Sequence, residues 1–166
     1  HNPFNSTEQV IEWLREQNIK IKVDVNQVKF SDLKGWHFDE NRNLRHNTGR
    51  FFSIEGIDVT TNWGKVSNWK QPIINQPEVG YLGIITKKID GMLYFLLQAK
   101  VEPGNVNNVQ LSPTIQATKS NYTQAHGGAK PLYLEYFQGA TKEQILLDQL
   151  QSEQGARFLR KRNRNI

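Results

Sequence analysis

The chain has 166 residues, 37% of them hydrophobic and 22% charged, which favours one folded domain over residues 1–166 and excludes a disordered chain. Its formal net charge is +5, and it contains no cysteine, so disulfides and thiolate chemistry are excluded and a reducing, cytoplasmic setting is expected. The polar start shows no secretory leader, and no apolar run approaches the roughly 18 residues of a membrane-spanning helix, so we expect no membrane partner.

The first elements are predicted in an N-terminal extension that covers residues 1–30. Ser6 is followed three residues later by Gln9, which is the capping-box pattern of a helix start. An apolar stripe at helical spacing then predicts a helix to about Asn18. Residues 19–25 alternate Ile or Val with Lys or Asp, a period of two that predicts a half-buried strand. The extension should therefore be a helix followed by a strand.

Three strands are predicted in the middle of the chain, over residues 51–60, 80–88 and 92–102. The last two are separated by an Asp-Gly pair, which is a strong signal for a β-hairpin. Residues 63–77, between the first two strands, combine tryptophan, proline and amide side chains. That stretch is too polar for a core and too aromatic for a plain linker, so we interpret it as a loop that carries binding residues.

The last third of the chain predicts shorter elements. A strand over residues 110–118 is interrupted by Pro113, which is typical of an edge or bulged strand. A polar loop follows over residues 119–131, and then a short strand over residues 132–137. A second capping box predicts a helix over residues 141–150. Together the elements indicate an α+β or α/β layered domain with a mixed sheet.

Three polar side chains, Gln98, Lys100 and Glu102, occupy alternate positions at the end of the third predicted strand. Side chains at this spacing share one face of a strand, so an amide, an ammonium and a carboxylate stand side by side. A purely structural strand would more often carry apolar side chains there or leave that face to water, so we interpret the row as a functional site. The alternative is a surface ion pair between Lys100 and Glu102, which is a common and weak interaction.

The net positive charge lies at the C-terminus. Residues 157–166 hold five Lys or Arg residues and no acid, and the 16 other cations are balanced by the 16 Asp and Glu residues. Such a cluster indicates an anion site for phosphate or nucleic acid, or alternatively a solvated tail.

Six stretches of the sequence together carry a resemblance to a known family. They are GRFFSIEG at residues 49–56, WKQPIINQPE at 69–78, QAKVEPGN at 98–105, QLSPT at 110–114, QSEQG at 151–155 and LRKRNR at 159–164. With them the chain resembles, over nearly its whole length after residue 30, the NDP-hexose 2,3-dehydratases of deoxysugar biosynthesis. Chains of that family are tandem duplications of two such domains, and this sequence resembles the first. The resemblance therefore implies a fragment, a single-domain relative, or a chain that pairs as a homodimer.

The same resemblance implies a fold. The family is Nudix-like, so this α+β chain is expected to form an α/β/α sandwich with a mixed β-sheet. A Nudix helix carries several metal-binding carboxylates, but over residues 148–156 only Glu153, Gly155 and the apolar positions of that pattern are present. One glutamate does not make a divalent metal site. The resemblance thus implies a Nudix scaffold without a metal and without Nudix hydrolysis.

The resemblance also implies a reaction, the removal of the C2 hydroxyl from a dTDP-linked 4-keto-6-deoxyhexose without a cofactor. The ketone acidifies the C3 proton, so the site needs a base at C3 and donors to the leaving hydroxyl and the C4 oxygen. Glu102 is the candidate base, provided that burial makes it basic enough. Lys100 is the candidate for the enolate oxygen or the diphosphate, and Tyr122 for the leaving hydroxyl. Tyr122 can instead pack on the core, and His46 is an alternative base in a turn that is more often solvent-exposed.

Substrate-binding candidates follow from the same resemblance. Trp69 can stack on thymine, unless it is a core tryptophan. The polar candidates share an amide or hydroxyl that can bind the base, the ribose or the sugar, although amides equally suit turns and edge strands. They are Gln71, Asn75, Gln76, Gln98, Gln110, Gln116, Ser120 and Asn121. Arg160 and Arg162 in an extended segment, helped by Arg157, are the candidates for the diphosphate.

Two other functions stay open. One is a non-catalytic domain that binds a dTDP-sugar and supports dimerisation. The other is a nucleic-acid-binding module that uses the basic C-terminus and the stretch of tryptophans and amides. Residues 1–156 are neutral overall and offer no basic stripe, so no nucleic-acid partner is expected.

Overall fold

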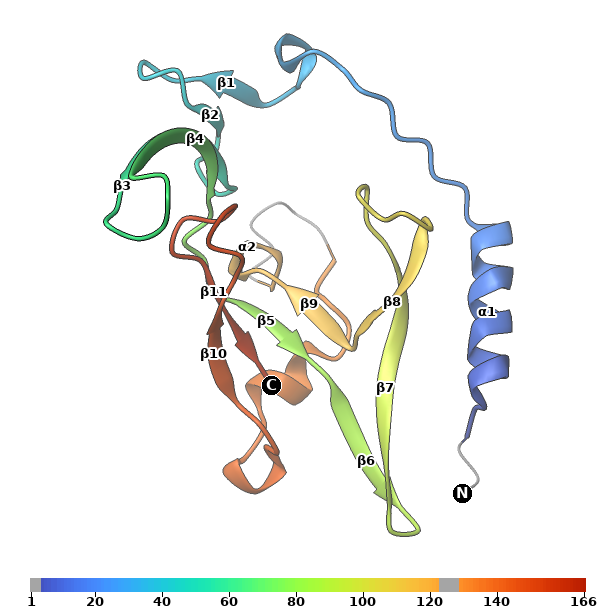
Figure 1. Cartoon of the computed structure of the whole chain (residues 1–166). Helices are drawn as coiled ribbons and strands as arrows, with labels where there is room; N and C mark the ends of the chain where they lie inside the picture. The colour runs from blue at the N-terminus through green and yellow to red at the C-terminus, as the bar shows by residue number, and fades with distance from the viewer. Residues whose placement is uncertain (1–3, 123–128) are drawn as a thin grey trace.

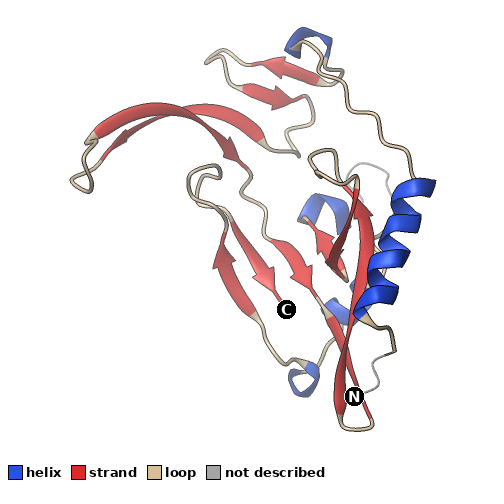
Figure 2. Ribbon diagram, turned by 45° about the vertical axis from the view of Figure 1, so that its right-hand side comes forward, coloured by secondary structure: helices blue, strands red, loops and turns tan. Residues whose placement is uncertain are grey.

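The computed structural model describes residues 4–122 and 129–166 (Figure 1). In these residues the chain forms three β-sheets, a helix of 14 residues and several short helical turns (Figure 2). One of the sheets contains a parallel strand pair and the others are antiparallel, so the predicted α+β class with a mixed sheet is confirmed. No helix of this described part has both the length and the apolar character needed to cross a membrane.

Helix α1 (Thr7–Lys20) begins at the capping box that the sequence predicts. The Ser6 hydroxyl accepts from the Gln9 N–H at 3.2 Å, and the Gln9 side chain accepts from the Ser6 N–H at 2.8 Å. These reciprocal bonds satisfy backbone donors that the first turn leaves unpaired. Near the other end, the Asn18 amide bonds both the N–H and the carbonyl of Val109, which ties the helix to a distant strand.

The predicted strand over residues 19–25 is wrong. The helix continues to Lys20, and the chain then crosses to the first sheet without regular structure until the 3-10 turn η1 (Phe30–Asp32) (Figure 1). A strand needs a neighbour for its backbone hydrogen bonds. Among the described residues no strand pairs with this segment, so the alternating pattern alone does not make one.

The first sheet is an antiparallel meander of β1 (Trp36–Phe38), β2 (Leu44–His46), β3 (Ser53–Thr60) and β4 (Asn68–Asn75). Strands β3 and β4 pair over eight residues and form the long curved hairpin at the left of Figure 2. The predicted binding loop over residues 63–77 is therefore mostly strand. Pro72 is tolerated there because β4 is an edge strand of its sheet.

The second sheet has the order β10 (Gln149–Ser152), β11 (Arg162–Asn165), β5 (Gly80–Gly83) and β9 (Ile115–Ala117), with β11 and β5 parallel. The third joins β6 (Ile85–Ile89), β7 (Met92–Val101) and β8 (Val109–Pro113). The strand predicted over residues 80–88 is split at Ile84, where the chain passes between the two sheets. The predicted interruption at Pro113 is confirmed, and so is the Asp-Gly hairpin, with φ of 49° at Asp90 and 80° at Gly91.

A small core lies where α3 (Leu134–Gln138) packs on the second sheet. It consists of buried apolar side chains from β9 and α3, namely Ile115, Ala117, Leu134 and Phe137. Gly83 permits this contact, because a Cβ at that position would lie 2.1 Å from Cε1 of Phe137. The predicted strand over residues 132–137 is thus wrong, since its two buried residues lie three apart on one face of a helical turn.

The predicted helix over residues 141–150 is wrong beyond its first turn. Its capping box is present, but it begins only the 3-10 turn η2 (Lys142–Gln144). The chain then extends into β10, which pairs with β11 over four residues. Just before β10, the Asp148 carboxylate accepts from Nε of Arg164 at 2.7 Å. This pairing of distant segments outweighs the helical propensity of the leucine-rich stretch.

Candidate functional site

An ion pair lies at the end of β7, where the alternating pattern predicts it. Nζ of Lys100 lies 2.9 Å from Oε1 of Glu102, and Gln116 of β9 donates to the same oxygen at 3.1 Å. In the part of the chain that the structure describes, the other oxygen of this carboxylate, Oε2, has no hydrogen-bond partner. Two donors therefore orient the carboxylate and leave Oε2 open to a proton from a ligand.

The burial expected of a catalytic base is only partly present. The side chain of Glu102 is 43% exposed and that of Lys100 is 27% exposed. An ion pair this accessible adds little to stability, so the alternative of a surface ion pair stays open. A bound ligand or a second protein surface would have to remove the remaining water from the pair.

Amide side chains surround the pair on the same face of the sheet. Gln110 of β8 stands opposite Lys100, is half-buried, and has no side-chain hydrogen bond among the described residues. Gln98 is partly committed, because its amide nitrogen donates to the carbonyl oxygens of Pro113 and Thr114 at 3.0 and 3.2 Å. Gln98 thus holds the corner between β8 and β9, and only its oxygen is left for a ligand.

A second group of predicted residues lies on β4. The Trp69 indole N–H donates to Oε1 of Gln71 at 2.7 Å, and the Gln71 amide donates to the Ala156 carbonyl at 2.9 Å. Trp69 is 39% exposed, so it is not a core tryptophan. An open depression of about 410 Å³ lies beside it, lined by Gly56, Ile57, Asp58, Lys70 and Gln71. Gln76, just past the strand, is half-buried and has no side-chain hydrogen bond within the described segments.

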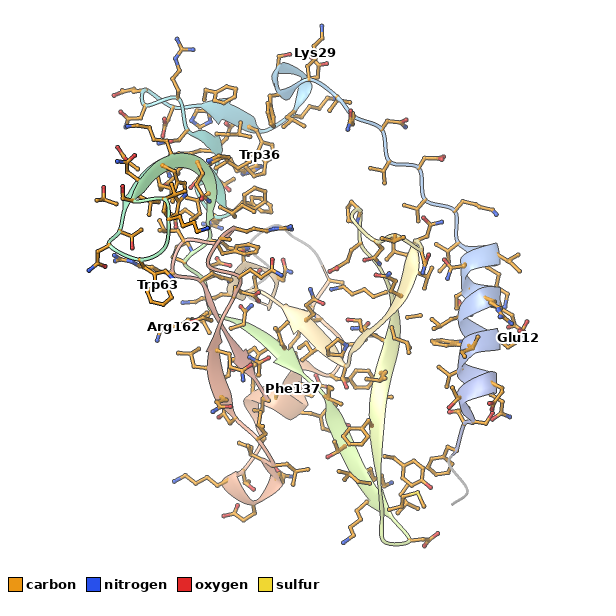
Figure 3. The ribbon with its side chains drawn as sticks, in the orientation of Figure 1. Glu12, Lys29, Trp36, Trp63, Phe137 and Arg162 are labelled. Carbon is orange, nitrogen blue, oxygen red and sulfur yellow. The ribbon has the colours of Figure 1, made fainter. Side chains whose placement is uncertain are left out.

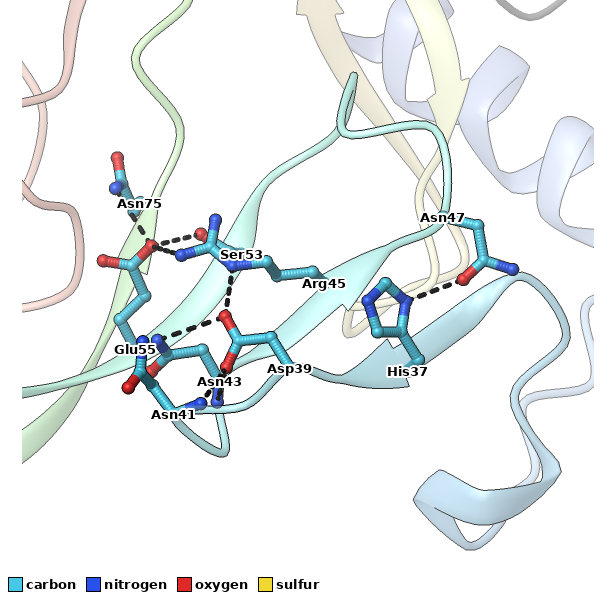
Figure 4. Close-up of polar contacts among 9 residues, drawn as sticks. All are labelled: His37, Asp39, Asn41, Asn43, Arg45, Asn47, Ser53, Glu55 and Asn75. Carbon is cyan, nitrogen blue, oxygen red and sulfur yellow. Dashed lines mark hydrogen bonds and ion pairs between the residues drawn. The ribbon is translucent and has the colours of Figure 1, made fainter.

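Asn75, also predicted to bind substrate, belongs instead to a network within the first sheet (Figure 4). Its amide donates to Glu55 at 3.2 Å, and Arg45 lies 2.6 Å from Asp39 and 3.0 Å from Glu55. The Arg45 guanidinium lowers the pKa of Asp39, and a hydrogen bond from the Ser53 hydroxyl lowers the pKa of Glu55. One N–H of the Asn75 amide is thus committed to Glu55, and its assignment to the substrate stays a prediction.

Helix α2 (Lys119–Tyr122) carries three predicted residues. Ser120 is buried, and its N–H and its hydroxyl donate to Oε2 of Glu78 at 3.1 and 2.9 Å. Ser120 therefore anchors the helix and is not available to sugar hydroxyls, contrary to the prediction. The side chain of Asn121 is exposed, whereas that of Tyr122 lies outside the described residues.

The three predicted arginines lie on the segment between β10 and β11. Arg157, Arg160 and Arg162 are exposed, and their guanidinium groups have no partner among the residues the structure describes. The segment is not helical. Arg162 begins β11 and is extended as predicted, whereas Arg160 lies in a bend with a left-handed φ of 49°, so the extended conformation predicted for it is wrong. It runs beside the end of β4, where Ile74 donates to the Arg157 carbonyl at 2.8 Å and accepts from the Leu159 N–H at 2.9 Å. The arginines and the indole thus share one region of the molecule.

Lys161 is a buried cation that the sequence analysis did not single out. It is 4% exposed, and its ammonium group donates to the carbonyl oxygen of Glu78. Burial lowers the pKa of Lys161, and the nearby carboxylates of Glu78 and Glu153 oppose that shift. A period of two within the basic cluster of residues 157–166 could have revealed Lys161, but counting the charges alone does not show that period.

His46, the alternative base, is held among aromatic rings. Its ring lies 5.3 Å from the Trp36 ring and 4.4 Å from the Phe51 ring, and Nδ1 is 2.9 Å from the Thr48 hydroxyl. This packing favours a structural role. Across the described residues, no three His, Asp, Glu or Cys side chains come together as a metal site.

The predicted residues therefore form two groups. One is the cluster of Lys100, Glu102, Gln110 and Gln116 on β7, β8 and β9, and the other surrounds β4 and the arginine segment. The β3–β4 hairpin and the β7–β8 pair lie on opposite sides of the molecule in both Figure 1 and Figure 2. Figure 3 shows Arg162 beside strands β10 and β11, on the side of the hairpin.

Comparison with known proteins finds one family. A family model described as NDP-hexose 2,3-dehydratase matches residues 7–166. A protein of Saccharopolyspora spinosa named dTDP-4-dehydro-6-deoxy-alpha-D-glucopyranose 2,3-dehydratase is 54% identical over 155 residues, covering 93% of this chain and 32% of that protein. Proteins of the same name from Amycolatopsis orientalis and Streptomyces violaceoruber are 49% and 45% identical, covering 96% and 93% of this chain and 35% of each relative. The chain spans about one third of the length of the curated relatives it matches.

Proposed function

Because the chain belongs to the NDP-hexose 2,3-dehydratase family, we propose that it takes part in removing the C2 hydroxyl of a dTDP-linked 4-keto-6-deoxyhexose. Relatives between 45% and 54% identical carry the name of a 2,3-dehydratase of such a sugar. The proposed activity is that of a carbon–oxygen lyase in deoxysugar biosynthesis.

The chemistry follows from the ketone at C4. A base removes the C3 proton, and the electron pair forms an enolate over C3, C4 and the C4 oxygen. The pair then moves to form a C2–C3 double bond as the C2–O bond breaks, and the hydroxyl leaves as water after accepting a proton. The resulting enol tautomerises to a 3,4-diketo-2,6-dideoxy sugar. The sum is the loss of one water, so the step needs no oxidant or reductant.

The ion pair of Lys100 and Glu102, with the Gln116 amide beside it, carries the proposal. Oε1 of Glu102 is held by the two donors, so Oε2 is the atom assigned to the C3 proton. The Lys100 ammonium then stands beside the enolate, where a fixed positive charge stabilises the developing negative charge. Gln110 is assigned to a sugar hydroxyl, and Tyr122 to the proton that the leaving hydroxyl accepts.

The second group is assigned to the nucleotide. The exposed face of Trp69 suits the flat thymine ring, and the Gln71 amide beside it suits the polar edge of the base or ribose. Arg157, Arg160 and Arg162 are assigned to the diphosphate, because a guanidinium binds phosphate oxygens through two parallel hydrogen bonds. Their lack of partners among the described residues supports this assignment.

Two proposals concern the architecture. The chain is proposed to be one repeat of a Nudix-like scaffold, and two copies are proposed to pair. The α/β/α sandwich of that scaffold stays a prediction, since the stretch over residues 148–156, expected to hold its helix, is β10 and the turn after it. Pairing is supported by the apolar side chains that one face of β7 exposes to solvent.

Turnover tests the proposed function. The chain is incubated with dTDP-4-keto-6-deoxyglucose in the presence and absence of excess EDTA, and the products are identified by mass spectrometry. We expect the dehydrated sugar to form at the same rate in both samples, because the step is assigned to side chains alone. A loss with EDTA that magnesium restores would contradict metal independence, and unchanged substrate would contradict the catalytic role.

A non-catalytic dTDP-sugar-binding domain is the second candidate. It is favoured by the 43% exposure of the Glu102 side chain and by the separation of the β3–β4 hairpin, which carries Trp69, from the β7–β8 pair. It predicts that dTDP raises the melting temperature of the chain while the 4-keto substrate is never converted. An oligonucleotide in the same thermal-shift assay provides the comparison, since a nucleic-acid module would respond to it more strongly than to dTDP.

A further inference from the structure

Lys161 is buried between two exposed arginines, and the proposed chemistry makes no use of it. We propose that Lys161 and Asn163 are positioning residues, which turn Arg160 and Arg162 outward as a pair so that both guanidinium groups bind one diphosphate. The inference rests on the proposed function, because it concerns how the assigned diphosphate site is built.

Exposure along this segment alternates from residue to residue. Arg160 and Arg162 are exposed, whereas Lys161 is 4% exposed and Asn163 is 8% exposed. Arg160 lies in a bend and Arg162 on β11, and both are open to solvent while the residue that follows each of them is buried. Figure 3 shows Arg162 on the side of the β3–β4 hairpin.

Both inward side chains bind the start of β5 and the residues just before it. The Lys161 ammonium donates to the Glu78 carbonyl oxygen, and the Asn163 side-chain oxygen accepts from the Gly80 N–H at 3.1 Å. The Asn163 amide nitrogen also donates to Glu153. The far end of each inward side chain is thus bound by a residue of β5, or by a residue next to β5 or β10.

An apolar residue would fill the position of Lys161 without the penalty of removing an ammonium group from water. The lysine instead supplies a long stem and a donor that reaches a fixed carbonyl, with the carboxylates of Glu78 and Glu153 near enough to favour its charge. Lys161 also directly follows Arg160, whose φ of 49° is a left-handed conformation that is unfavourable for a residue with a Cβ.

The outward pair suits a diphosphate. Such a ligand presents two adjacent sets of negatively charged oxygens, and each guanidinium can bind one set through parallel hydrogen bonds. Arg160 and Arg162 have no ion-pair partner in the described part of the chain, so neither has to give up an existing contact to bind the ligand.

The substitution Lys161→Met tests the inference, since it keeps the length of the side chain and removes its donor and its charge. Isothermal titration of the 166-residue chain should show dTDP binding weakened by about tenfold, as for the loss of one charged hydrogen bond, with thymidine binding unchanged. In a chain that already carries Arg160→Ala and Arg162→Ala, the same substitution should have no further effect. The matched control is Lys142→Met at an exposed lysine, which should change neither ligand.

Equal losses of dTDP and thymidine, or a further loss in the double-arginine background, would overturn the inference. Arg160→Ala separates it from the proposed function: if that change leaves the preference for dTDP over thymidine intact, the assigned diphosphate site is wrong. If Arg160→Ala removes the preference and Lys161→Met does not, the site stands and only the positioning role fails.

Chemical protection of the unmodified chain tests the pair without any substitution. Phenylglyoxal should modify Arg160 and Arg162, and dTDP should protect both to the same extent. Acetic anhydride should leave Lys161 unmodified with or without dTDP, because its amine is buried. Protection of one arginine alone, or acetylation of Lys161 in the folded chain, would contradict the inference.

Discussion

The two oxygens of Glu102 have different surroundings. Oε1 accepts from Lys100 and Gln116, while Oε2 has no partner within the described residues. We propose that Oε2 takes a proton that a neighbouring ketone has acidified, which requires the C4 oxygen of the substrate to lie near the Lys100 ammonium. The ion pair and the substrate are therefore expected to act together.

Alanine at Lys100 or at Glu102 should lower turnover much more than affinity. Each side chain is assigned to charge that develops only in the transition state, so we expect a loss in kcat of about a hundredfold or more with dTDP affinity nearly unchanged. Steady-state kinetics and titration calorimetry measure the two effects. Glu12→Ala, which breaks the exposed pair with Arg15 at 3.2 Å, is the control and should change neither. Lost affinity with intact turnover would assign Lys100 and Glu102 to binding.

The Arg45 network should make the first sheet sensitive to acid. The pKa values of Asp39 and Glu55 are lowered in the folded chain, so their contribution to stability is present above the ordinary carboxyl range near pH 4 and is lost as the pH falls below it. Urea unfolding followed by tryptophan fluorescence should show this loss on acidification, and Arg45→Met should reduce it. A free energy of unfolding with the same pH dependence in both chains would show that the network has no such role.

At the scale of elements, the close contact between β5 and α3 should tolerate no side chain at Gly83. A Cβ there would lie 2.1 Å from the Phe137 ring, so either the strand or the helix must move. We expect Gly83→Ala to lower the free energy of unfolding by about 1–3 kcal/mol, as overpacking does. Gly104→Ala, where a Cβ would meet no atom within 4 Å, is the control. Equal urea midpoints for the two variants would contradict the packing described here.

Elements that depend on local chemistry could be predicted from the sequence. The capping box begins α1, the Asp-Gly pair makes the hairpin between β6 and β7, and Pro113 ends β8. Elements that depend on a distant partner could not be predicted from the sequence. Strand β11 exists because it pairs with β5, about 80 positions earlier in the chain, and β10 exists because it pairs with β11. No local pattern over residues 141–150 distinguishes that outcome from a helix.

The same limit applies to the candidate site. The Lys100–Glu102 pair could be predicted because a period of two places neighbours on one strand. The contacts of Ser120 and Asn75 could not be predicted, since their partners Glu78 and Glu55 are 42 and 20 positions away in the chain. A polar side chain has the same appearance in a sequence whether it faces a ligand or a distant carboxylate.

At the scale of the whole molecule, one face of β7 exposes a row of large apolar side chains. Its members are Leu93, Phe95, Leu97 and Val101, between 39% and 60% exposed. Contiguous apolar surface of this kind is typical of an interface, and the opposite face of the strand carries the proposed catalytic pair. Pairing of two copies through this row would cover it and leave the polar face to the substrate.

Sedimentation velocity should therefore show a dimer at about tens of micromolar chain, the range in which a micromolar or tighter dimer persists. The substitution Phe95→Lys should shift the population to monomer, because it places a charge in the centre of the proposed interface. Val106→Lys changes an apolar residue that is 89% exposed in a loop and should leave the dimer intact. Monomer alone for the unsubstituted chain would contradict pairing.

The assignment of the C3 proton to Glu102 is tested most directly by hydrogen exchange in the substrate. The chain is mixed with dTDP-4-keto-6-deoxyglucose in D₂O, and the sugar is followed by proton NMR. We expect the C3 proton signal to disappear and solvent deuterium to enter C2 of the 3,4-diketo product, with both changes abolished by Glu102→Gln. If the C3 proton persists while dTDP-sugar binds, or if Glu102→Gln exchanges it as fast as the unsubstituted chain, Glu102 is not the base.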